Sequence, residues 1–513
     1  MIKKTDIILS IISGIMLVLA FPPFDLYLFA WIALVPLLIA LWDKNARVSF
    51  LVGVITGLVY FLGTIYWVFH SMYFYGYIAA PLSALILLLL CLYLALYTGL
   101  FSVLFNFISG RSRLPALVIV PFLWVTLDMM RTYVPILGFP WSSLGYSQYK
   151  FLPLIQIADI TGIYGISFLV AAVNSSIYDV IFYWPKKMAQ EPLLPRWPLT
   201  LSIIILLVTI TGILLYGYEK LSEGGSRSSI KVSVVQGNIP QDKKWDAKFQ
   251  SEVIDTYKRL TLSVSRSSPD LIVWPETAVP FIFGYDQPLT QDIISFQKQL
   301  GSYLLFGSML AKDADRLSNS AVLLSPDGTI VSTYDKIHLV PYGEYVPLRS
   351  LFPFIEKITV GIGDFLPGEE PVVMKTPFAK IGTLICYEII FPGLVRKFVD
   401  RDANVLVTIT NDAWFGRTSA PYQHFYMAVF RAVENRVPVV RAANTGISGF
   451  IDSKGRIIRK SDIFVEATLT ENIAIGSKKS FYTKYGDLFA YACIACTLLM
   501  LINRLLHEKR KFL

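Results

Sequence analysis

The chain has 513 residues, of which 54% are hydrophobic and only 16% are charged, and its formal net charge is +9. Soluble globular proteins carry about 25% charged residues, so the composition disfavours an ordinary soluble enzyme and rules out a disordered chain. The length allows roughly two to four domains.

Apolar residues concentrate in the first 220 positions, in seven stretches that are about long enough to cross a bilayer as a helix, roughly 20 residues. We predict spans at 6–22, 26–42, 48–69, 77–108, 114–131, 153–184 and 198–218, and an eighth near the C-terminus at about 487–502. Core helices of a large soluble protein are the weaker alternative, because the seven stretches follow one another. The chain therefore divides into a seven-span bundle (1–221), a domain of soluble composition (222–480), and an eighth span with a basic tail (481–513).

Lysine and arginine are enriched in short cytoplasmic loops, so their placement predicts the orientation. If Met1 is cytoplasmic, thirteen Lys and Arg residues lie in cytoplasmic segments, whereas the short outer loops hold only Arg131 and Lys150. We expect both termini in the cytoplasm and residues 222–480 outside it. The first stretch resembles a signal peptide, but a second span follows at once, so we expect an uncleaved anchor.

The positive charge follows the same division. Residues 222–480 hold 29 of the 46 Lys and Arg residues and 27 of the 37 Asp and Glu residues, a balance of +2. The membrane portions hold the other 17 and 10, a balance of +7. The basic character therefore reflects topology, and we expect no nucleic-acid partner.

Four cysteines are present, and three of them, Cys91, Cys493 and Cys496, lie in predicted spans. Cys493 and Cys496 have the spacing of a redox or metal pair but no His or acidic partner nearby, so we interpret them as small apolar helix residues. Cys386 is alone in the outer domain, in a compartment where disulfides form. A lone thiol there is a candidate nucleophile, and an inert buried cysteine is the alternative.

The outer domain alternates short β-branched runs with turns and helical stretches, which predicts an α/β layered domain. In chain order we predict strands at 230–236, 271–274, 303–308, 321–324, 329–334, 381–385, 405–410, 439–442, 449–451 and 457–459. Helices are predicted over 249–265 and 422–436.

Polar residues follow the ends of four of these strands: Glu276, Lys336, Cys386 and Asn411. Each alone could be a surface or core residue, but strand ends are where a rigid scaffold holds reacting groups. A thiol needs a base, because only the thiolate attacks, and the reaction needs hydrogen-bond donors where the carbonyl oxygen gains charge. Glu276 can supply the base, while Lys336 and the main-chain N–H after Cys386 can supply the donors.

These residues lie in segments that resemble the Glu–Lys–Cys triad motifs of the nitrilase superfamily: Val273–Glu276, Tyr334–Leu339 and Leu384–Glu388. From the first span to the last, the chain resembles the bacterial apolipoprotein N-acyltransferase family. Further segments that are similar to that family or to the superfamily are Gly138–Trp141, Gly237–Gln241, Lys244-Trp245, Val340–Pro347, Asn411–Gly416 and Arg431–Arg436.

The resemblance implies a membrane bundle of eight transmembrane helices with an extracytoplasmic nitrilase-like domain, an α-β-β-α sandwich, in the bacterial inner membrane. It also implies a ping-pong acyl transfer. Glu276 would deprotonate Cys386, which would attack the sn-1 ester of a phospholipid, expected to be phosphatidylethanolamine. Lys336 and the amide of Tyr387 would hold the oxyanion. The α-amino group of the diacylglyceryl cysteine of an apolipoprotein would then take the acyl chain.

Other residues are expected to support this site. Glu344 and Glu388 could position Lys336, or could be surface carboxylates. The tryptophans Trp245, Trp414 and Trp141 and the amide Asn411 are candidate substrate-binding residues, although tryptophans also occur as plain core. The apolar segment Pro347–Pro367 is either a lid that dips toward lipid or an ordinary buried loop.

No cofactor or metal is expected, because the four histidines do not cluster and no zinc-ligand spacing or Gly-x-Ser-x-Gly motif occurs. The expected partners are the phospholipid donor, the diacylated apolipoprotein and membrane lipid, and we expect a monomer. Two alternatives remain at this stage. Seven spans are compatible with a transporter, although the spans hold only a few charged residues (Asp128, Asp159 and Asp179), and a membrane-tethered amidase would use the same triad with water.

Overall fold

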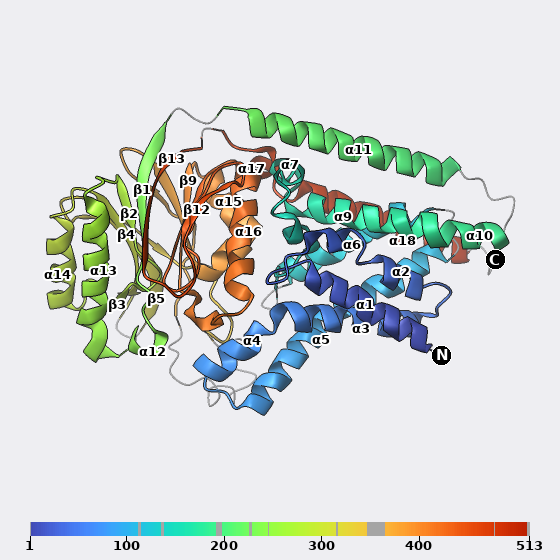
Figure 1. The fold of residues 1–513 in the computed structure, drawn as a ribbon, viewed down its shortest axis with the longest axis horizontal. Coiled ribbons are helices and arrows are strands. Elements are labelled where there is room, and N and C mark those ends of the chain that lie inside the picture. The colour runs from blue at the N-terminus through green and yellow to red at the C-terminus, as the bar shows by residue number, and fades with distance from the viewer. Residues whose placement is uncertain are drawn as a thin grey trace. The chain divides into compact units, whose positions relative to one another are not determined.

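The computed structural model describes residues 2–110, 114–134, 138–190, 197–224, 228–244, 246–313, 316–345, 365–476 and 478–509. The chain forms two compact units (Figure 1). The first, here called the helical unit, comprises Met1–Phe69, Ala79–Ser222 and Asp487–Leu513. The second, here called the α/β unit, comprises His70–Ile78 and Glu223–Gly486.

The helical unit contains apolar helices of very different lengths. Its longer helices are α1 (Lys4–Leu19), α3 (Ala46–Ile65), α5 (Ala80–Ser109), α6 (Ala116–Tyr133), α9 (Ile163–Tyr178), α11 (Trp197–Ser222) and α18 (Leu488–Lys509). Shorter helical segments are η1 (Tyr27–Trp31), α2 (Val35–Ala40), α4 (Trp67–His70), η3 (Leu144–Gln148), α7 (Leu152–Ile155), α8 (Ala158–Thr161), η4 (Asp179–Tyr183) and α10 (Trp184–Gln190).

Six helices of the described chain are long and apolar enough to cross a membrane: Ala46–Ile65, Ala80–Ser109, Ala116–Tyr133, Ile163–Ala189, Pro198–Ser222 and Leu488–His507. They fall on the third to eighth predicted stretches. The first stretch forms α1, which has only 16 residues, because Pro22 and Pro23 follow and proline cannot continue a helix. The second stretch is broken into η1 and α2, with a proline at the start of α2. The number of eight spans therefore stays a prediction.

The acidic residues of the helical unit have local partners. The carboxylate of Asp179 accepts the main-chain N–H groups of Ala116 (3.0 Å) and Leu117 (2.8 Å), which caps the start of α6. Asp159 accepts the hydroxyl of Tyr216 at 2.7 Å. Such local bonding is typical of structural carboxylates, and it weakens the transporter alternative, which rested on charged residues that mark a pathway.

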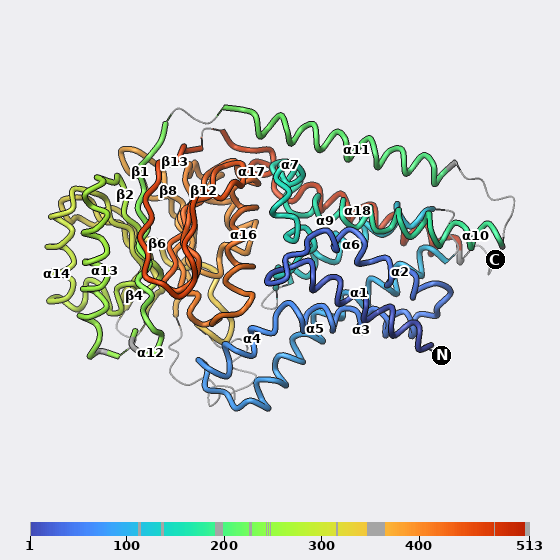
Figure 2. The backbone as a smooth tube through the Cα atoms, viewed as in Figure 1, coloured from blue at the N-terminus to red at the C-terminus, as the bar shows by residue number. Residues whose placement is uncertain are grey.

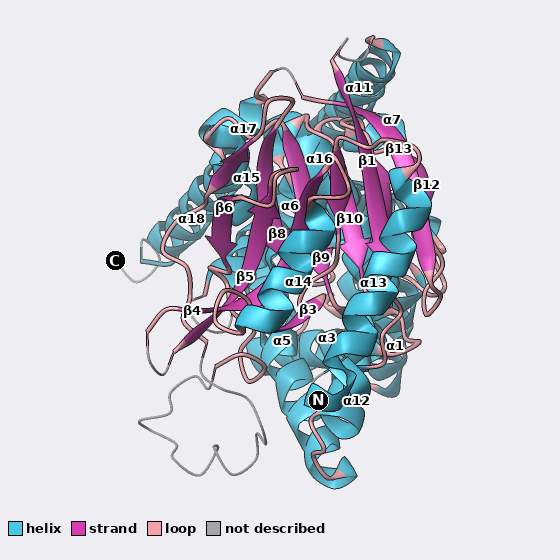
Figure 3. Ribbon diagram, turned by 90° about the vertical axis from the view of Figure 1, so that its left-hand side faces the viewer, coloured by secondary structure: helices cyan, strands magenta, loops and turns pink. Residues whose placement is uncertain are grey.

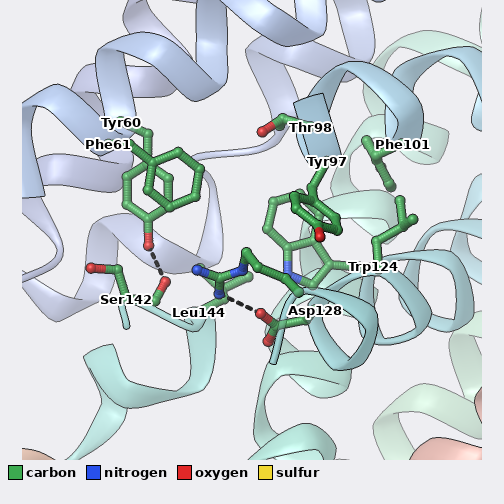
Figure 4. A pocket seen from close by; sticks show the side chains of 11 residues that line it. Tyr60, Phe61, Tyr97, Thr98, Phe101, Trp124, Asp128, Ser142 and Leu144 are labelled. Carbon is green, nitrogen blue, oxygen red and sulfur yellow. Dashed lines mark hydrogen bonds and ion pairs between the residues drawn. The ribbon is translucent and has the colours of Figure 1, made fainter. Parts of the chain in front are cut away.

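The third of these residues, Asp128, forms an ion pair with Arg131 at 2.5 Å beside a cavity of about 40 Å³ (Figure 4). Aromatic side chains form much of the cavity wall, and the Tyr60 hydroxyl donates to the main-chain oxygen of Ser142 there. Arg131 also donates to the main-chain oxygen of Trp141 at 2.6 Å. The ion pair thus fixes the loop that carries Trp141.

The α/β unit is built on two sheets that face each other. The first has the order β13-β1-β2-β4-β5-β6, with β3 paired to β4, and the second has the order β12-β11-β10-β9-β8-β7. The strands are β1 (Ser229–Gln236), β2 (Leu271–Val273), β3 (Val279–Ile282), β4 (Tyr303–Ala311), β5 (Leu317–Leu324), β6 (Ile330–Asp335), β7 (Val373–Lys375), β8 (Lys380–Ile385), β9 (Val405–Thr410), β10 (Val439–Ala443), β11 (Gly449–Ile451), β12 (Ile457–Lys460) and β13 (Ala467–Ala474).

Helices cover the outer faces of both sheets. Figure 3 shows α13 (Gln250–Ser265) and α14 (Gln287–Gln297) in front of the first sheet, and Figure 1 shows α15 (Pro392–Asp400) and α16 (Ala420–Asn435) beyond the second. This gives the α-β-β-α layering that the family resemblance implies. Strand β13 lies beside β1 (Figure 2), pairing antiparallel from Ala474 opposite Ser229 to Ala467 opposite Gln236. The last strand of the unit thus joins its first.

The core beneath α13 explains why this helix forms. Its buried residues, Val253, Ile254, Tyr257, Leu260, Thr261 and Val264, recur at helical spacing and pack toward the first sheet. Strands β1, β2 and β4 are parallel, as are β8, β9 and β10. In such sheets, reacting groups gather where the strands end.

Candidate active site

Glu276 lies in the turn that leaves β2, and its carboxylate is nine-tenths buried. Strand β4 passes directly against this turn. A Cβ atom on Gly307 of β4 would lie 2.4 Å from the amide nitrogen of Thr277 and 2.7 Å from the Cα of Glu276. Only glycine therefore allows this approach, and Thr277 itself has a φ of +46°, in the left-handed region. The main chain around Glu276 is held tightly.

Lys336 follows β6, and its side chain is 1% exposed. Its Nζ lies 2.9 Å and 2.8 Å from the two carboxylate oxygens of Glu344 and 3.6 Å from Oε1 of Glu276. Burial alone would lower the pKa of Lys336, but Glu344 and Glu276 hold it above its ordinary value. Lys336 is therefore a fixed cation between two carboxylates.

Asn319 of β5 connects these two carboxylates. Its Nδ2 donates to Oε1 of Glu276 at 2.8 Å and to Oε1 of Glu344 at 2.7 Å. The second oxygen of Glu276 accepts the main-chain N–H of Asn411, just after β9, at 2.9 Å. Both oxygens of Glu276 are thus oriented by donors from opposite sheets.

Cys386 stands where β8 turns into a short 3-10 helix (Cys386–Ile390), and it is 9% exposed. Its φ of +52° lies in the left-handed region, which is unfavourable for a residue with a side chain. Strain of this kind persists only where the surroundings impose it, and it clusters at active sites. The turn thereby sets the direction of the thiol.

The charges of the site act on this thiol. Burial raises the pKa of Cys386, and the carboxylate of Glu276 raises it further. The charge of Lys336 opposes that rise. The thiol is therefore protonated at rest, so attack requires a base to take its proton, and Glu276 is the carboxylate whose charge acts most strongly on it.

Glu388 ties the Cys386 turn to the Lys336 loop. Its Oε2 accepts the N–H of Ile385 at 2.8 Å, and its Oε1 accepts the N–H groups of Ile337 (2.8 Å) and His338 (3.1 Å) and the hydroxyl of Tyr334 (2.7 Å). Burial raises the pKa of Glu388 to about 7, and these donors offset part of the rise. Glu388 is thus a buried anchor, and the alternative of a surface carboxylate is wrong.

A buried polar cluster lies behind Cys386 and was not singled out from the sequence. Nδ1 of His424 lies 2.9 Å from Nη2 of Arg441, and Nε2 lies 3.2 Å from the main-chain oxygen of Cys386. Because a main-chain carbonyl can only accept, Nε2 carries a proton and donates to that oxygen, while Nδ1 faces both Arg441 and, at 3.1 Å, Oδ1 of Asp412. Arg441 also pairs with Asp412 at 2.8 Å, and Asp412 accepts the Thr410 hydroxyl at 2.9 Å.

The pKa directions agree with this assignment. Burial, together with the nearby Arg441, lowers the pKa of His424, which favours the neutral ring. Burial alone would raise the pKa of Asp412, but the charge of Arg441 holds it below its ordinary value. A weak signal for the cluster exists in the sequence, since charged residues occur within apolar helical and strand patterns, but their partners are distant along the chain.

Both polar atoms of the Asn411 side-chain amide form hydrogen bonds. Its Nδ2 donates to Gln241 of α12 (Gln241–Lys244) at 2.7 Å, and its Oδ1 accepts from Asn444 at 3.1 Å. Through its main-chain N–H it orients Glu276. These contacts favour a positioning role for Asn411 over the predicted substrate-binding role.

The remaining predicted residues have varied surroundings. Tyr387 packs edge-on against Phe391 with ring centroids 5.1 Å apart. Trp414 is 37% exposed, and its main-chain oxygen accepts the Ser71 hydroxyl at 2.8 Å. Trp141 is fully buried in the helical unit, where it packs against Trp67 with ring centroids 4.7 Å apart. Trp245 lies outside the described residues, as does the proposed lid, Pro347–Pro367, except for residues 365–367.

A second buried lysine, Lys244, also reaches the site and donates to the main-chain oxygen of Glu276 at 2.8 Å. The sequence contained it only as part of a family-like segment, with no role assigned. Within the described ranges, no group of three or more His, Cys, Asp or Glu side chains is arranged to hold a metal ion. The described site thus offers the Cys386 thiol, the carboxylates Glu276 and Glu344, and two buried lysines.

Comparison with known proteins assigns both parts of the chain. Residues 13–176 match the apolipoprotein N-acyltransferase N-terminal domain, and residues 231–481 match the carbon-nitrogen hydrolase family. The chain is 45% identical to the apolipoprotein N-acyltransferase of Geobacter metallireducens over 96% of this chain and 94% of that protein. It is 32% identical to the enzyme of the same name from Pasteurella multocida, again over 96% and 94%. A solved amidase from Nesterenkonia sp. AN1 is 18% identical, with a TM-score of 0.39, over 53% of this chain and 99% of that one.

Proposed function

The chain belongs to the apolipoprotein N-acyltransferase family, and from this premise we propose that it N-acylates apolipoproteins through a thioester on Cys386. The donor is a phospholipid, with the sn-1 ester of phosphatidylethanolamine as the expected source. The acceptor is the α-amino group of the N-terminal diacylglyceryl cysteine. The observation that supports this most is that a carboxylate, Glu276, and a buried ammonium group, Lys336, 3.6 Å apart, both act on the charge of a buried, strained thiol, in opposite directions.

In the first half-reaction, Glu276 takes the proton of Cys386 while the sulfur attacks the ester carbonyl. Lys336 keeps its proton because Glu344 faces it, so it stabilises the oxyanion as a fixed charge together with the amide of Tyr387. The tetrahedral intermediate collapses, the C–O bond breaks, and Glu276 returns the proton to the departing lysophospholipid. The product is an acyl thioester on Cys386.

In the second half-reaction, the neutral amine of the acceptor attacks the thioester, and Glu276 takes a proton from it. The C–S bond breaks, the amide forms, and Glu276 returns the proton to the sulfur, so the thiol of Cys386 and the carboxylate of Glu276 are both regenerated. This two-step scheme is the logic of covalent catalysis, and it leaves the same carboxylate as base in both steps.

We further propose the membrane arrangement that the charge pattern predicts: a bundle over 1–221, a catalytic domain over 222–480 and a last span over 481–513, in a bacterial inner membrane. Both termini are cytoplasmic, and the catalytic domain lies on the outer side, where the two lipid-anchored substrates are. The protein acts as a monomer.

The test is intact-mass spectrometry of the full chain in phospholipid vesicles, before and after addition of a diacylated lipopeptide. Wild type gains one acyl group on Cys386 and passes it to the lipopeptide amine, whereas Cys386→Ala does neither. N-acylation by Cys386→Ala contradicts the proposal. An adduct that water discharges, with no N-acylated lipopeptide, indicates the amidase alternative instead.

A further inference from the structure

Lys244 ends α12, the helical turn that follows β1, and its side chain is fully buried. Its Nζ donates to the main-chain oxygen of Glu276 at 2.8 Å. No carboxylate of the described residues lies at ion-pair distance from it, in contrast to Lys336, which both oxygens of Glu344 contact. Burying a lysine without a carboxylate partner costs desolvation free energy, so the presence of Lys244 at this position calls for a physical reason.

The charges of the site provide that reason. Glu344 lies within 2.9 Å of Lys336 through both oxygens, whereas Glu276 lies 3.6 Å from the same ammonium group. Lys336 and Glu344 therefore neutralise each other most closely. Lys244 is the second cation, which balances Glu276 at rest. When the proton moves from the thiol to Glu276, negative charge appears on sulfur and then on the oxyanion, and that charge needs a nearby cation.

We propose that Lys244 is a positioning residue of the acyl-transfer site, which holds the main chain of Glu276 and supplies the positive charge that balances the Cys386 thiolate. This inference rests on the proposed function. Lys244 acts through Glu276 and through its field, and it takes no proton from the substrate.

The electrostatics of the site agree with this role. Burial lowers the pKa of Lys244 to about 8, and the charges of Glu276 and of the Cys386 thiolate offset part of the fall. These two groups belong to the turn after β2 and to the end of β8, and the other charged groups of the site, Lys336 and Glu344, pair with each other at 2.8 Å. Because the folded pKa is lowered, Lys244 is charged below about pH 8 and neutral above it. The thiolate therefore loses its balancing charge as the pH rises through 8.

The experiment measures the reactivity of Cys386 from pH 6 to 10 in the full chain, with Lys244→Met as the variant. Two rates are measured: alkylation of the Cys386 peptide by iodoacetamide, and acyl-enzyme formation from phospholipid vesicles. The matched control is Lys248→Met, an exposed lysine in the next helical turn. We expect Lys244→Met to slow both rates at least about tenfold at pH 7, the equivalent of one pKa unit, and Lys248→Met to leave them unchanged.

The pH dependence separates this role from simple packing. The ratio of wild-type to Lys244→Met rates should fall toward one above pH 8, because the wild type then loses the same charge. A ratio that stays constant from pH 6 to 10, or alkylation of Lys244→Met at the wild-type rate, overturns the inference. If Lys244→Met does not accumulate as folded protein, Lys244→Arg provides the test. Its permanent charge should raise its rates relative to wild type above pH 8, and a flat ratio overturns the inference.

Alkylation does not depend on acyl transfer, so the two proposals fail separately. If wild type forms no acyl thioester but Lys244→Met is alkylated more slowly than wild type, only the proposed function is contradicted. If wild type forms the acyl thioester and Lys244→Met shows the wild-type rates of alkylation and acyl-enzyme formation, only this inference is contradicted.

Discussion

Replacement of Glu388 tests whether a buried carboxylate holds the two halves of the site together. Ile337 and His338, whose N–H groups it accepts, directly follow Lys336, and Ile385, whose N–H it also accepts, directly precedes Cys386. With the Tyr334 hydroxyl, the carboxylate satisfies four buried donors. Glu388→Ala would leave all four without a partner, and Glu388→Gln would keep most of them.

The magnitudes follow from these contacts. An unsatisfied buried donor costs about 1–3 kcal/mol, so four cost about 4–12 kcal/mol, which is comparable to the free energy of unfolding of a whole domain, about 5–15 kcal/mol. We expect Glu388→Ala not to accumulate as folded protein. In Glu388→Gln, the amide oxygen can keep the three donors at Oε1, while its NH₂ group meets the N–H of Ile385. That single loss of about 1–3 kcal/mol corresponds to roughly a 5- to 150-fold lower rate if it all falls on the geometry of Cys386.

The assay combines thermal unfolding in detergent with the rate of acyl-enzyme formation. For a unit of this size, the loss in Glu388→Gln predicts a Tm lower by roughly 2–12 °C, together with the slower acylation. Glu466→Gln is the matched control, because this carboxylate pairs with Arg259 on the surface and should change neither quantity. A folded Glu388→Ala that acylates at the wild-type rate refutes the reasoning, as does Glu388→Gln with unchanged Tm and rate.

Three further predictions use the same assays. Asn319→Leu removes the donor that Glu276 and Glu344 share and should slow acyl-enzyme formation about tenfold or more. An unchanged rate of acyl-enzyme formation would contradict this role. Gly307→Ala should lower both Tm and acylation, because its Cβ collides with main chain, whereas Gly212→Ala has open space and should lower neither. Burial lowers the pKa of His424, so the unfolded chain takes up a proton first as the pH falls below about 6.5. Wild type should therefore lose stability below that pH, and His424→Gln, which cannot titrate but keeps a donor, should lack this part of the loss; parallel Tm profiles from pH 5 to 8 would contradict it.

The predicted strands and helices of the α/β unit agree well with the structure, because buried parallel strands appear as short apolar runs that end in polar residues. That pattern indicated Cys386 and Asn411, which directly follow such runs, and Glu276, which comes three residues after Val273, the last residue of β2. Strands β3, β7 and β13 and helices α14 and α15 were missed. Strand β13 pairs on one side at the sheet edge and alternates with polar residues, so it lacks the apolar run of a buried strand. The predicted domain boundaries stay predictions.

The contacts that orient the site could not be predicted from the sequence. Asn319 lies within β5 and His424 lies within α16, where a polar residue has no local signature. Their partners come from segments 25 to 43 residues away in the case of Asn319, and 38 residues away in the contact of His424 with Cys386. Only the packing of the two sheets brings these groups together, so the sequence pattern indicated the reacting residues and the positioning carboxylates Glu344 and Glu388 but gave no sign of Asn319 or His424.

The directions of the pKa shifts separate the roles of the buried groups. A thiol whose pKa is raised cannot rest as a thiolate, so the proton must leave during attack, and a base must be present at that moment. A lysine whose pKa is raised cannot serve as that base, because Glu344 and Glu276 keep Lys336 protonated. Glu276 therefore has to accept the proton, and its orientation by Asn319 and Asn411 becomes a requirement of the chemistry. The same logic explains why the site contains two carboxylates and two lysines. Lys336 and Glu344 keep their charges throughout, whereas Glu276, which Lys244 contacts through its main chain, gains and loses a proton while the acyl group moves.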